Sequence, residues 1–313
     1  MSEANAVAPN GVRAGDNVRR GILLSVVAVV VLGIQDAVSK ILVQDYSSFQ
    51  VVMIRYWAFA ALSLFLALRQ APLRHALKSK VPLLQTLRGV LLMADIWLYA
   101  LAIRTVPLAE LQAISLVYPL LVTLLAVPLL GERVGPFRLI AVGVGFLGAL
   151  VIVRPGGLPI DADVMFALGS ALAYAVYITL TRKVSSQDPT ATSMVYVGVV
   201  GLLLSSAVGI LHWQPMDLRA WLLAIVLMVT MCTGHGLMMM ALSMAPASLL
   251  QPFSYFSLPW GITLSFVVFG HLIDPISLLG AAVIVGAGLV VMARERRRST
   301  HKPGPAEALG PRE

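Results

Sequence analysis

Apolar runs of about 20 residues, separated by short polar connections, follow one another along nearly the whole chain. Wound as an α-helix, such a run matches the roughly 30 Å hydrocarbon core of a bilayer. We therefore predict an all-α, polytopic membrane protein with ten transmembrane helices. The predicted spans are 20–43, 48–68, 83–103, 107–129, 137–153, 163–181, 191–211, 220–242, 246–269 and 275–293.

The composition agrees with a membrane protein. Of the 313 residues, 58% are hydrophobic and only 12% are charged, whereas a soluble domain carries about 25% charged residues. The net charge is +8. A cluster of arginines directly after the last span contributes to it, formed by Arg294, Arg296, Arg297 and Arg298. At that place the cluster indicates contact with anionic lipid headgroups. We therefore expect membrane lipid as a partner and no nucleic acid.

Lys and Arg are distributed unevenly between the two sides of the membrane. Positive residues are enriched in cytoplasmic loops, and a cytoplasmic N-terminus places most of them there. The inside positions are Arg13, Arg19, Arg20, Arg69, Arg74, Lys78, Lys80, Arg133, Arg138, Arg182, Lys183 and the cluster after residue 293, and the outside loops hold Arg104, Arg154 and Arg219. The count predicts a multi-pass protein with both termini in the cytoplasm.

Residues 107–153 and 246–292 read as two copies of one segment, offset by 139 residues. Pro107, Leu111, Gln112, Ser115, Gly131 and Pro136 correspond to Pro246, Leu250, Gln251, Ser254, Gly270 and Pro275. Matched Pro, Gln, Ser and Gly residues at one offset indicate an internal duplication, since chance would align mainly Leu and Val.

The duplication sets the predicted domain organisation. We predict a disordered tail over 1–19, a first five-helix repeat over 20–154, a second five-helix repeat over 163–293 and a basic tail over 294–313. Because each half contains five spans, an odd number, the second repeat enters the membrane inverted. Two fused, inverted halves are typical of secondary transporters, in which the halves meet at a central substrate site.

Charged residues inside the spans are candidates for chemistry, because each costs about 2.5–3.5 kcal/mol at a helix centre. Asp36 and Arg55 lie at similar depth on consecutive antiparallel helices, and Asp95 and Tyr99 share a face of the third. Asp36 is either a substrate or proton site or one half of a structural ion pair with Arg55. Asp95 is an alternative partner for Arg55. Arg88, near the inner interface, is expected to extend to the headgroups.

Uncharged polar pairs recur in the two copies. Gln112 and Ser115 share one helix face, and so do Gln251 and Ser254. Pro252 frees a backbone carbonyl and can kink the ninth span, with Tyr255 close by. Polar groups beside interrupted helices at matching positions predict a substrate site; the alternative is hydrogen bonding between packed helices.

Further candidates lie in the other spans. Tyr174 and Tyr177 share a face of the sixth span and could line a substrate site, and His235 lies within the eighth. A lone histidine in a span is either a packing residue or a proton relay. Glu110, in the first turn of the fourth span, is expected near the outer surface, where it would favour the positive end of the helix dipole.

Catalysis is not supported. The chain has no phosphate-binding loop, nucleophile elbow or zinc-protease motif. We expect no enzyme activity, no catalytic residue, no cofactor and no metal site. Outside transport, a membrane receptor or a structural protein remains an alternative.

The turn Gly131-Glu132-Arg133-Val134-Gly135-Pro136, between two spans of the first copy, resembles the signature of the drug/metabolite transporter superfamily in its two-repeat EamA branch. In the second copy His271 and Leu272 replace the Glu-Arg pair. The resemblance implies ten helices around a central cavity, with the fifth and tenth at the periphery. Glycines in those two helices, such as Gly148 and Gly280, indicate close packing within the chain or in a homodimer.

Within this family, residues 33–40, 49–50 and 55–56 are similar to the same region of riboflavin and S-adenosylmethionine uptake carriers. The resemblance implies a secondary, non-ATP transporter of the bacterial inner membrane that moves a small-molecule metabolite by alternating access. Riboflavin uptake is the first candidate. The alternatives are S-adenosylmethionine uptake and export of amino acids, metallophores or drugs.

Overall fold

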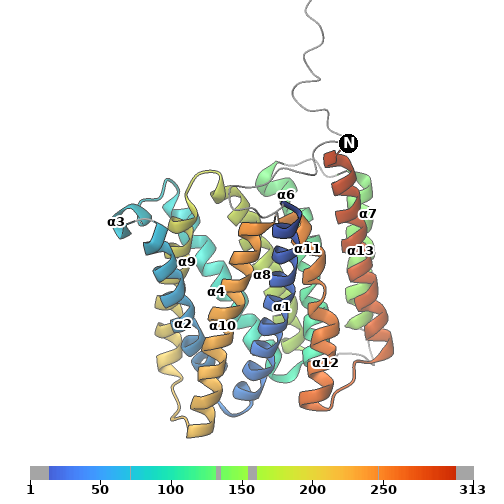
Figure 1. The fold of residues 1–313 in the computed structure, drawn as a ribbon. Helices are drawn as coiled ribbons and strands as arrows, with labels where there is room; N and C mark the ends of the chain where they lie inside the picture. Colours follow the sequence, from blue (N-terminus) through green and yellow to red (C-terminus); the bar gives the residue numbers. More distant parts are fainter. Residues whose placement is uncertain (1–13, 71, 132–134, 154–160, 246, 301–313) are drawn as a thin grey trace, which may run out of the picture.

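The computed structural model describes residues 14–70, 72–131, 135–153, 161–245 and 247–300, and this part of the chain contains helices and no strand. The helices are α1 (Ala14–Asp45), α2 (Ser48–Gln70), α3 (Leu73–Ala76), α4 (Pro82–Thr105), α5 (Leu108–Ser115), α6 (Tyr118–Leu130), α7 (Pro136–Ile152), α8 (Ala162–Ser185), α9 (Thr190–Leu211), α10 (Leu218–Met244), α11 (Ala247–Ser254), α12 (Ser257–Phe269) and α13 (Pro275–Thr300). They stand roughly side by side (Figure 1).

All ten predicted spans are helical in the described residues, which confirms the all-α prediction. In the part of the chain that the structure describes, nine segments are long and apolar enough to cross a membrane, and Pro136–Ile152 is a shorter apolar helix. The first and last helices are longer than predicted: α1 begins at Ala14, and α13 continues to Thr300. Residues 14–19 and 294–300, expected in the tails, are therefore helical. The remaining tail residues, 1–13 and 301–313, lie outside the described part.

Two spans are interrupted at matching positions. The fourth breaks between Ser115 and Tyr118, and the ninth breaks between Ser254 and Ser257. Proline follows each break, as Pro119 and Pro259, and cannot donate the backbone hydrogen bond that would continue the helix. The kink expected at Pro252 is therefore displaced toward the next turn.

The two copies also end alike. Gly131 after α6 has a φ of 70°, and Gly270 after α12 has a φ of 68°. Both glycines adopt the left-handed conformation that terminates a helix, which residues with a side chain rarely adopt. Matching breaks and matching caps at one offset confirm the internal duplication. Glu132 and Arg133 of the predicted turn lie outside the described residues.

The helices pack as two bundles that exchange elements between the repeats. The α1 bundle contains α1, α2, α10 and the broken span α11–α12, and the α4 bundle contains α4, the broken span α5–α6, α8 and α9. Each bundle thus contains two spans from each repeat. The internal symmetry that relates the two repeats also relates one bundle to the other. They meet where α2 packs on α9 and α5 packs on α12.

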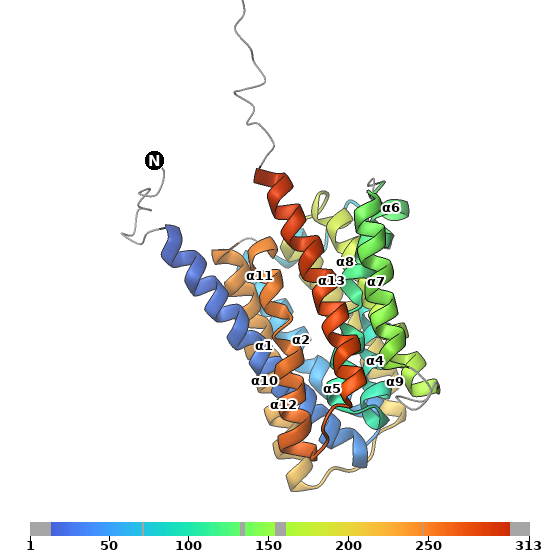
Figure 2. The ribbon, with the colours of Figure 1, turned by 90° about the vertical axis from the view of Figure 1, so that its right-hand side faces the viewer.

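The two described ends of the chain lie at one end of the molecule, here named the terminal end (Figures 1 and 2). A buried polar network there joins α4 to the loop before α9. Asp188 accepts hydrogen bonds from Ser79 (2.5 Å), Gln85 (2.9 Å) and the Lys80 backbone N–H (2.9 Å). Burial raises the pKa of Asp188, but these hydrogen bonds outweigh burial and hold it below its ordinary value. The carboxylate therefore stays charged at neutral pH.

Arg88 belongs to the same network, and this corrects the sequence interpretation. Its side chain is 3% exposed. It donates to Gln85 Oε1 (2.6 Å) and Ser193 Oγ (3.1 Å), and it lies over the ring of Tyr177. Arg88 therefore joins α4 to α8 and α9 and does not extend to the headgroups. The residue pattern of α4 alone could not show that Ser193 of α9 and Tyr177 of α8 contact Arg88.

Helices α7 and α13 pack against each other at one side of the molecule (Figure 2). Gly148 and Gly280 form the contact, since a methyl group on Gly280 would lie 2.5 Å from the Gly148 carbonyl oxygen. Gly143 and Gly286 on the same two helices face open space. The glycines of these two helices were expected to pack either within the chain or in a homodimer, and Gly148 and Gly280 pack within the chain.

We expect Gly280→Ala to lower the thermal unfolding midpoint of the purified protein in detergent, because the added methyl group overlaps backbone. The cost of overpacking is about 1–3 kcal/mol. Gly286→Ala is the matched control on the same helix and should leave the midpoint unchanged or raised. Equal midpoints for the two variants would contradict the close α7–α13 contact.

Candidate functional site

The candidate site begins with a carboxylate in the C-terminal third of α1. Asp36 Oδ2 accepts hydrogen bonds from Gln112 Nε2 (2.8 Å) and Tyr99 Oη (3.1 Å). Asp36 belongs to the α1 bundle, whereas Tyr99 on α4 and Gln112 on α5 belong to the α4 bundle. The carboxylate is therefore stabilised across the boundary between the bundles. Three residues predicted for the substrate site are brought together here.

Helix α12 sets the position of Gln112. A methyl group at Gly261 would lie 2.9 Å from Gln112 Cγ, so the absence of a side chain at Gly261 makes room for the glutamine. Gln112 is nearly buried, and its amide reaches both Asp36 and Tyr99. Helix α5 is the first half of the fourth span, and α12 is the second half of the ninth. The close approach of these two helices therefore directs the amide of Gln112 toward α1.

Arg55 and Asp95 lie in the same region without touching Asp36. Arg55, on α2, is 6% exposed and within electrostatic range of both carboxylates. The described residues give it no hydrogen bond and no ion pair, so the direct Asp36–Arg55 pair is not formed. Asp95 does not bond to Arg55 either, because its Oδ1 accepts from Ser170 Oγ of α8 (2.6 Å).

Aromatic rings adjoin this polar group. The ring centroids of Tyr118 and Tyr174 are 4.9 Å apart at 82°, and those of Tyr174 and Tyr177 are 5.9 Å apart at 31°. Tyr174 is within electrostatic range of Asp95. All three side chains are half-buried. The row of rings offers flat apolar surface beside the acids, a combination that suits a ring-bearing solute.

The other predicted site residues lie apart from Asp36. Ser115 Oγ donates to the Leu111 carbonyl oxygen (2.9 Å), one turn back on α5. Tyr255 is buried with its hydroxyl against Gly288 of α13. Ser254 is half-buried and has an interaction of its own.

Gln251 lies on α11, and its side chain is outside the described part. Gln251 corresponds to Gln112 in the second copy, and its place in the substrate site therefore stays a prediction.

His235 is a packed residue with a charged neighbour. Its Nδ1 is 3.0 Å from the Met231 carbonyl oxygen on the same helix, and its ring lies 5.3 Å from that of Phe59. Arg55 is within electrostatic range. The histidine therefore adjoins the candidate site from the α1 bundle.

The bundles are also joined at the end opposite the termini. The buried Lys40 donates to the carbonyl oxygens of Ile103 (2.6 Å) and Val106 (2.8 Å). His271 Nε2 lies 3.0 Å from Glu110 Oε1. Glu110 lies in the first turn of α5, as expected, and its side chain is buried against the loop after α12. Here His271 replaces the glutamate of the first copy's turn and provides the partner.

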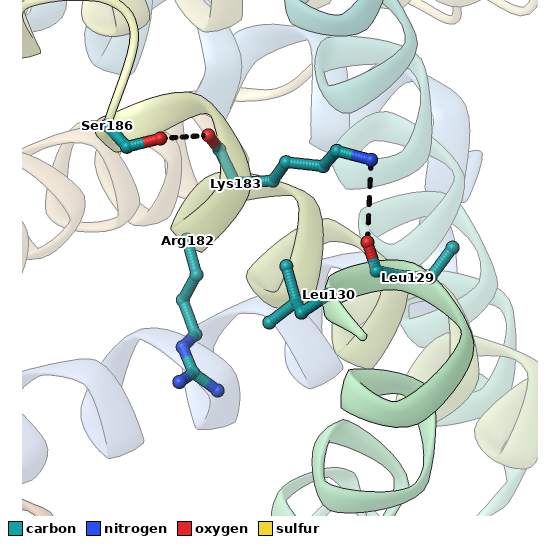
Figure 3. Close-up of a pocket in the computed structure, with 5 residues that line it drawn as sticks. All are labelled: Leu129, Leu130, Arg182, Lys183 and Ser186. Atoms are coloured by element: carbon teal, nitrogen blue, oxygen red, sulfur yellow. Dashed lines mark hydrogen bonds between the residues drawn. The ribbon is translucent and has the colours of Figure 1, made fainter. Parts of the chain in front are cut away.

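Two cavities lined by described residues lie at the ends of the helices. One of about 400 Å³ is lined by Leu129, Leu130, Arg182, Lys183 and Ser186 at the terminal end (Figure 3). Lys183 reaches the Leu129 carbonyl oxygen across it. The other, of about 330 Å³, includes Asp45 and His212 at the opposite end. Neither is lined by the Asp36 group, which differs from both in that donors from two helices of one bundle converge on a carboxylate of the other. Among the described residues no group of His, Cys, Asp or Glu is arranged to hold a metal ion.

This arrangement of repeated, partly broken membrane helices around central polar groups is typical of transporters. A model of the EamA-like transporter family matches residues 19–154 and again residues 162–293. The chain belongs to this family, with two copies of its domain, and is a multi-pass membrane transporter and not an enzyme. The resemblance drawn from the turn motif is confirmed.

Relatives give the same class. A riboflavin transporter of Vibrio cholerae is 30% identical over 206 residues, 66% of this chain and 69% of the relative. An S-adenosylmethionine uptake transporter of Rickettsia prowazekii is 24% identical over 284 residues, 90% of this chain and 95% of the relative. A crystal structure with 18% identity covers 90% of this chain and 98% of its own, with a TM-score of 0.60, and shows the fold alone.

Sequence reasoning missed Ser170, the hydrogen-bond partner of Asp95. A signal was available, because Ser170 precedes Tyr174 by four residues and shares its helix face. The role of Gly261 left no signal, since it depends on which helix approaches α5.

The Asp36–Gln112 contact predicts that substitutions at these two positions do not add. The double variant Asp36→Asn/Gln112→Leu should lower the thermal unfolding midpoint by less than the sum of the decreases that the two single variants cause. A hydrogen bond to a charged group contributes about 1.5–3 kcal/mol, and neighbours couple by about 0.5–3 kcal/mol. Asp36→Asn with Ser115→Ala is the matched control and should be additive. Additive effects in both pairs would show that the contact is absent.

Proposed function

We propose that this protein is a secondary transporter that takes up riboflavin across the bacterial inner membrane, with both termini in the cytoplasm. The observation that carries the proposal is the Asp36–Tyr99–Gln112 group, which joins the two bundles within the membrane-spanning helices. A solute bound there would contact both bundles at once. Rocking of one bundle against the other then exposes the solute to each side in turn.

The surroundings of this group support a ring-bearing solute. The tyrosines of α6 and α8 supply flat surfaces, and carboxylate, amide, hydroxyl and guanidinium groups supply hydrogen bonds. An isoalloxazine ring has a large apolar area and polar atoms along one edge, which matches this mixture. The relative from Vibrio cholerae, a riboflavin transporter, adds support for the substrate.

S-adenosylmethionine is the second candidate, and the charges of the site favour it. Asp36 and Asp95 together with Arg55 leave one excess negative charge when both acids are ionised. A sulfonium cation would balance that charge, whereas a neutral solute leaves it unbalanced unless a proton is bound. The Rickettsia relative covers 90% of the chain and carries this substrate in its name.

Uptake of labelled riboflavin by a riboflavin-auxotrophic bacterium tests the proposal. Cells that express the parent chain should accumulate the label, and Asp36→Asn should reduce the initial rate at least about tenfold, because one lost charged hydrogen bond corresponds to about 1.5–3 kcal/mol. Asp45→Asn, at an exposed position of the same helix, removes an equal charge and should keep the parent rate.

Membrane abundance is measured for every variant, so that loss of protein is not scored as loss of transport. Absence of riboflavin uptake with abundant protein would contradict the proposal, and uptake of labelled S-adenosylmethionine in the same cells would favour the second candidate. Riboflavin uptake that survives Asp36→Asn would keep the substrate and remove Asp36 from the site.

A further inference from the structure

Arg55 carries hydrogen-bond donors that nothing in the described part of the protein uses. The side chain is 6% exposed, and its Nε is buried without a partner. No hydrogen bond or ion pair of the guanidinium occurs among the described residues. Arg88 also has a buried Nε without a partner, but its terminal nitrogens differ from those of Arg55 because they donate to Gln85 and Ser193. A buried charge without hydrogen bonds is strongly unfavourable, so the Arg55 site favours a ligand that supplies acceptors.

The acids beside Arg55 each keep an oxygen without a donor. Asp36 takes both of its hydrogen bonds on Oδ2, and Asp95 takes the Ser170 hydrogen bond on Oδ1. The other oxygen of each carboxylate receives no hydrogen bond from the described residues. A carboxylate has about four acceptor positions. The region therefore presents unused donors on Arg55 beside unused acceptors on the acids.

We propose that Arg55 determines substrate specificity by donating to one carbonyl oxygen of a ring imide, while the free oxygen of Asp36 accepts the adjacent imide N–H. This inference rests on the proposed function and specifies which edge of the flavin ring is bound. In the isoalloxazine ring, the imide N–H lies between two carbonyl groups. An imide thus offers an acceptor to the guanidinium and a donor to the carboxylate at adjacent positions.

The tyrosines favour a ring imide over an amino-acid headgroup. A guanidinium binds a carboxylate well through paired hydrogen bonds, and an acid would hold the neighbouring ammonium, so a zwitterion is the competing ligand. The rings of Tyr118, Tyr174 and Tyr177 extend from the Asp95 side of the group. A planar ring whose edge meets Arg55 can lie along these rings, whereas a small aliphatic headgroup leaves them uncovered.

Binding of riboflavin analogues to purified protein tests the assignment, with flavin fluorescence quenching as the readout. The parent should bind riboflavin about 10- to 100-fold more tightly than N3-methylriboflavin, which lacks the imide hydrogen, because a site built to bond a group rejects the analogue without it. Lumiflavin keeps the imide and lacks the ribityl chain, so its ratio to riboflavin reports contacts elsewhere.

In Arg55→Met we expect the preference for riboflavin over N3-methylriboflavin to fall to within about threefold, because the ring is no longer held in register. The ratio of riboflavin to lumiflavin should stay at the parent value. Arg55→Lys keeps the charge and loses the planar fork, so it should fold and show the same loss of preference. Arg69→Met, at an exposed position of the same helix, should keep both ratios.

The outcomes separate the inference from the proposed function. If the parent binds riboflavin and the Arg55 variants keep its preference over N3-methylriboflavin, the imide assignment is overturned while riboflavin transport stands. If the parent binds S-adenosylmethionine and no riboflavin, both are overturned. Loss of the preference in Arg55→Lys with the lumiflavin ratio unchanged would establish the assignment.

Discussion

The position of Asp36 is the constraint on which the rest of the structure depends. A carboxylate within a membrane-spanning helix is costly unless donors reach it. In this protein both donors, Tyr99 and Gln112, come from the other bundle. The break between α5 and α6 and the bare backbone of Gly261 allow Gln112 to approach. Much of the local geometry is therefore explained by the requirement to satisfy one charge.

The same boundary between the bundles is closed at the end opposite the termini. Lys40 caps the carbonyl groups at the end of α4, and Ser48 donates to the Ala100 carbonyl oxygen. Glu110 and His271 connect the two repeats directly. In the orientation proposed above this end is external, so entry of a solute from outside requires these contacts to separate.

Apolar run length was enough to predict the fold, and the offset of 139 residues was enough to predict the duplication. Matching glycines and breaks confirm both. The candidate site was predicted in part: Asp36, Tyr99 and Gln112 do meet, but Asp36 and Arg55 are not in direct contact. Depth along a helix can be counted from the sequence, whereas rotation and neighbours are set by packing between distant segments. For the same reason Arg88 is buried where the sequence favoured the headgroups, and the pairing of Glu110 with His271 was not predicted.

Counterflow in proteoliposomes tests the central claim most directly, because it requires only the purified protein and a solute. Vesicles that contain the protein and are loaded with unlabelled riboflavin should accumulate labelled riboflavin from a dilute external solution, transiently and above equilibrium. Protein-free vesicles should show no such overshoot. Riboflavin binding without an overshoot, at confirmed reconstitution, would contradict a carrier with a site that alternates between the two sides and would indicate a receptor instead.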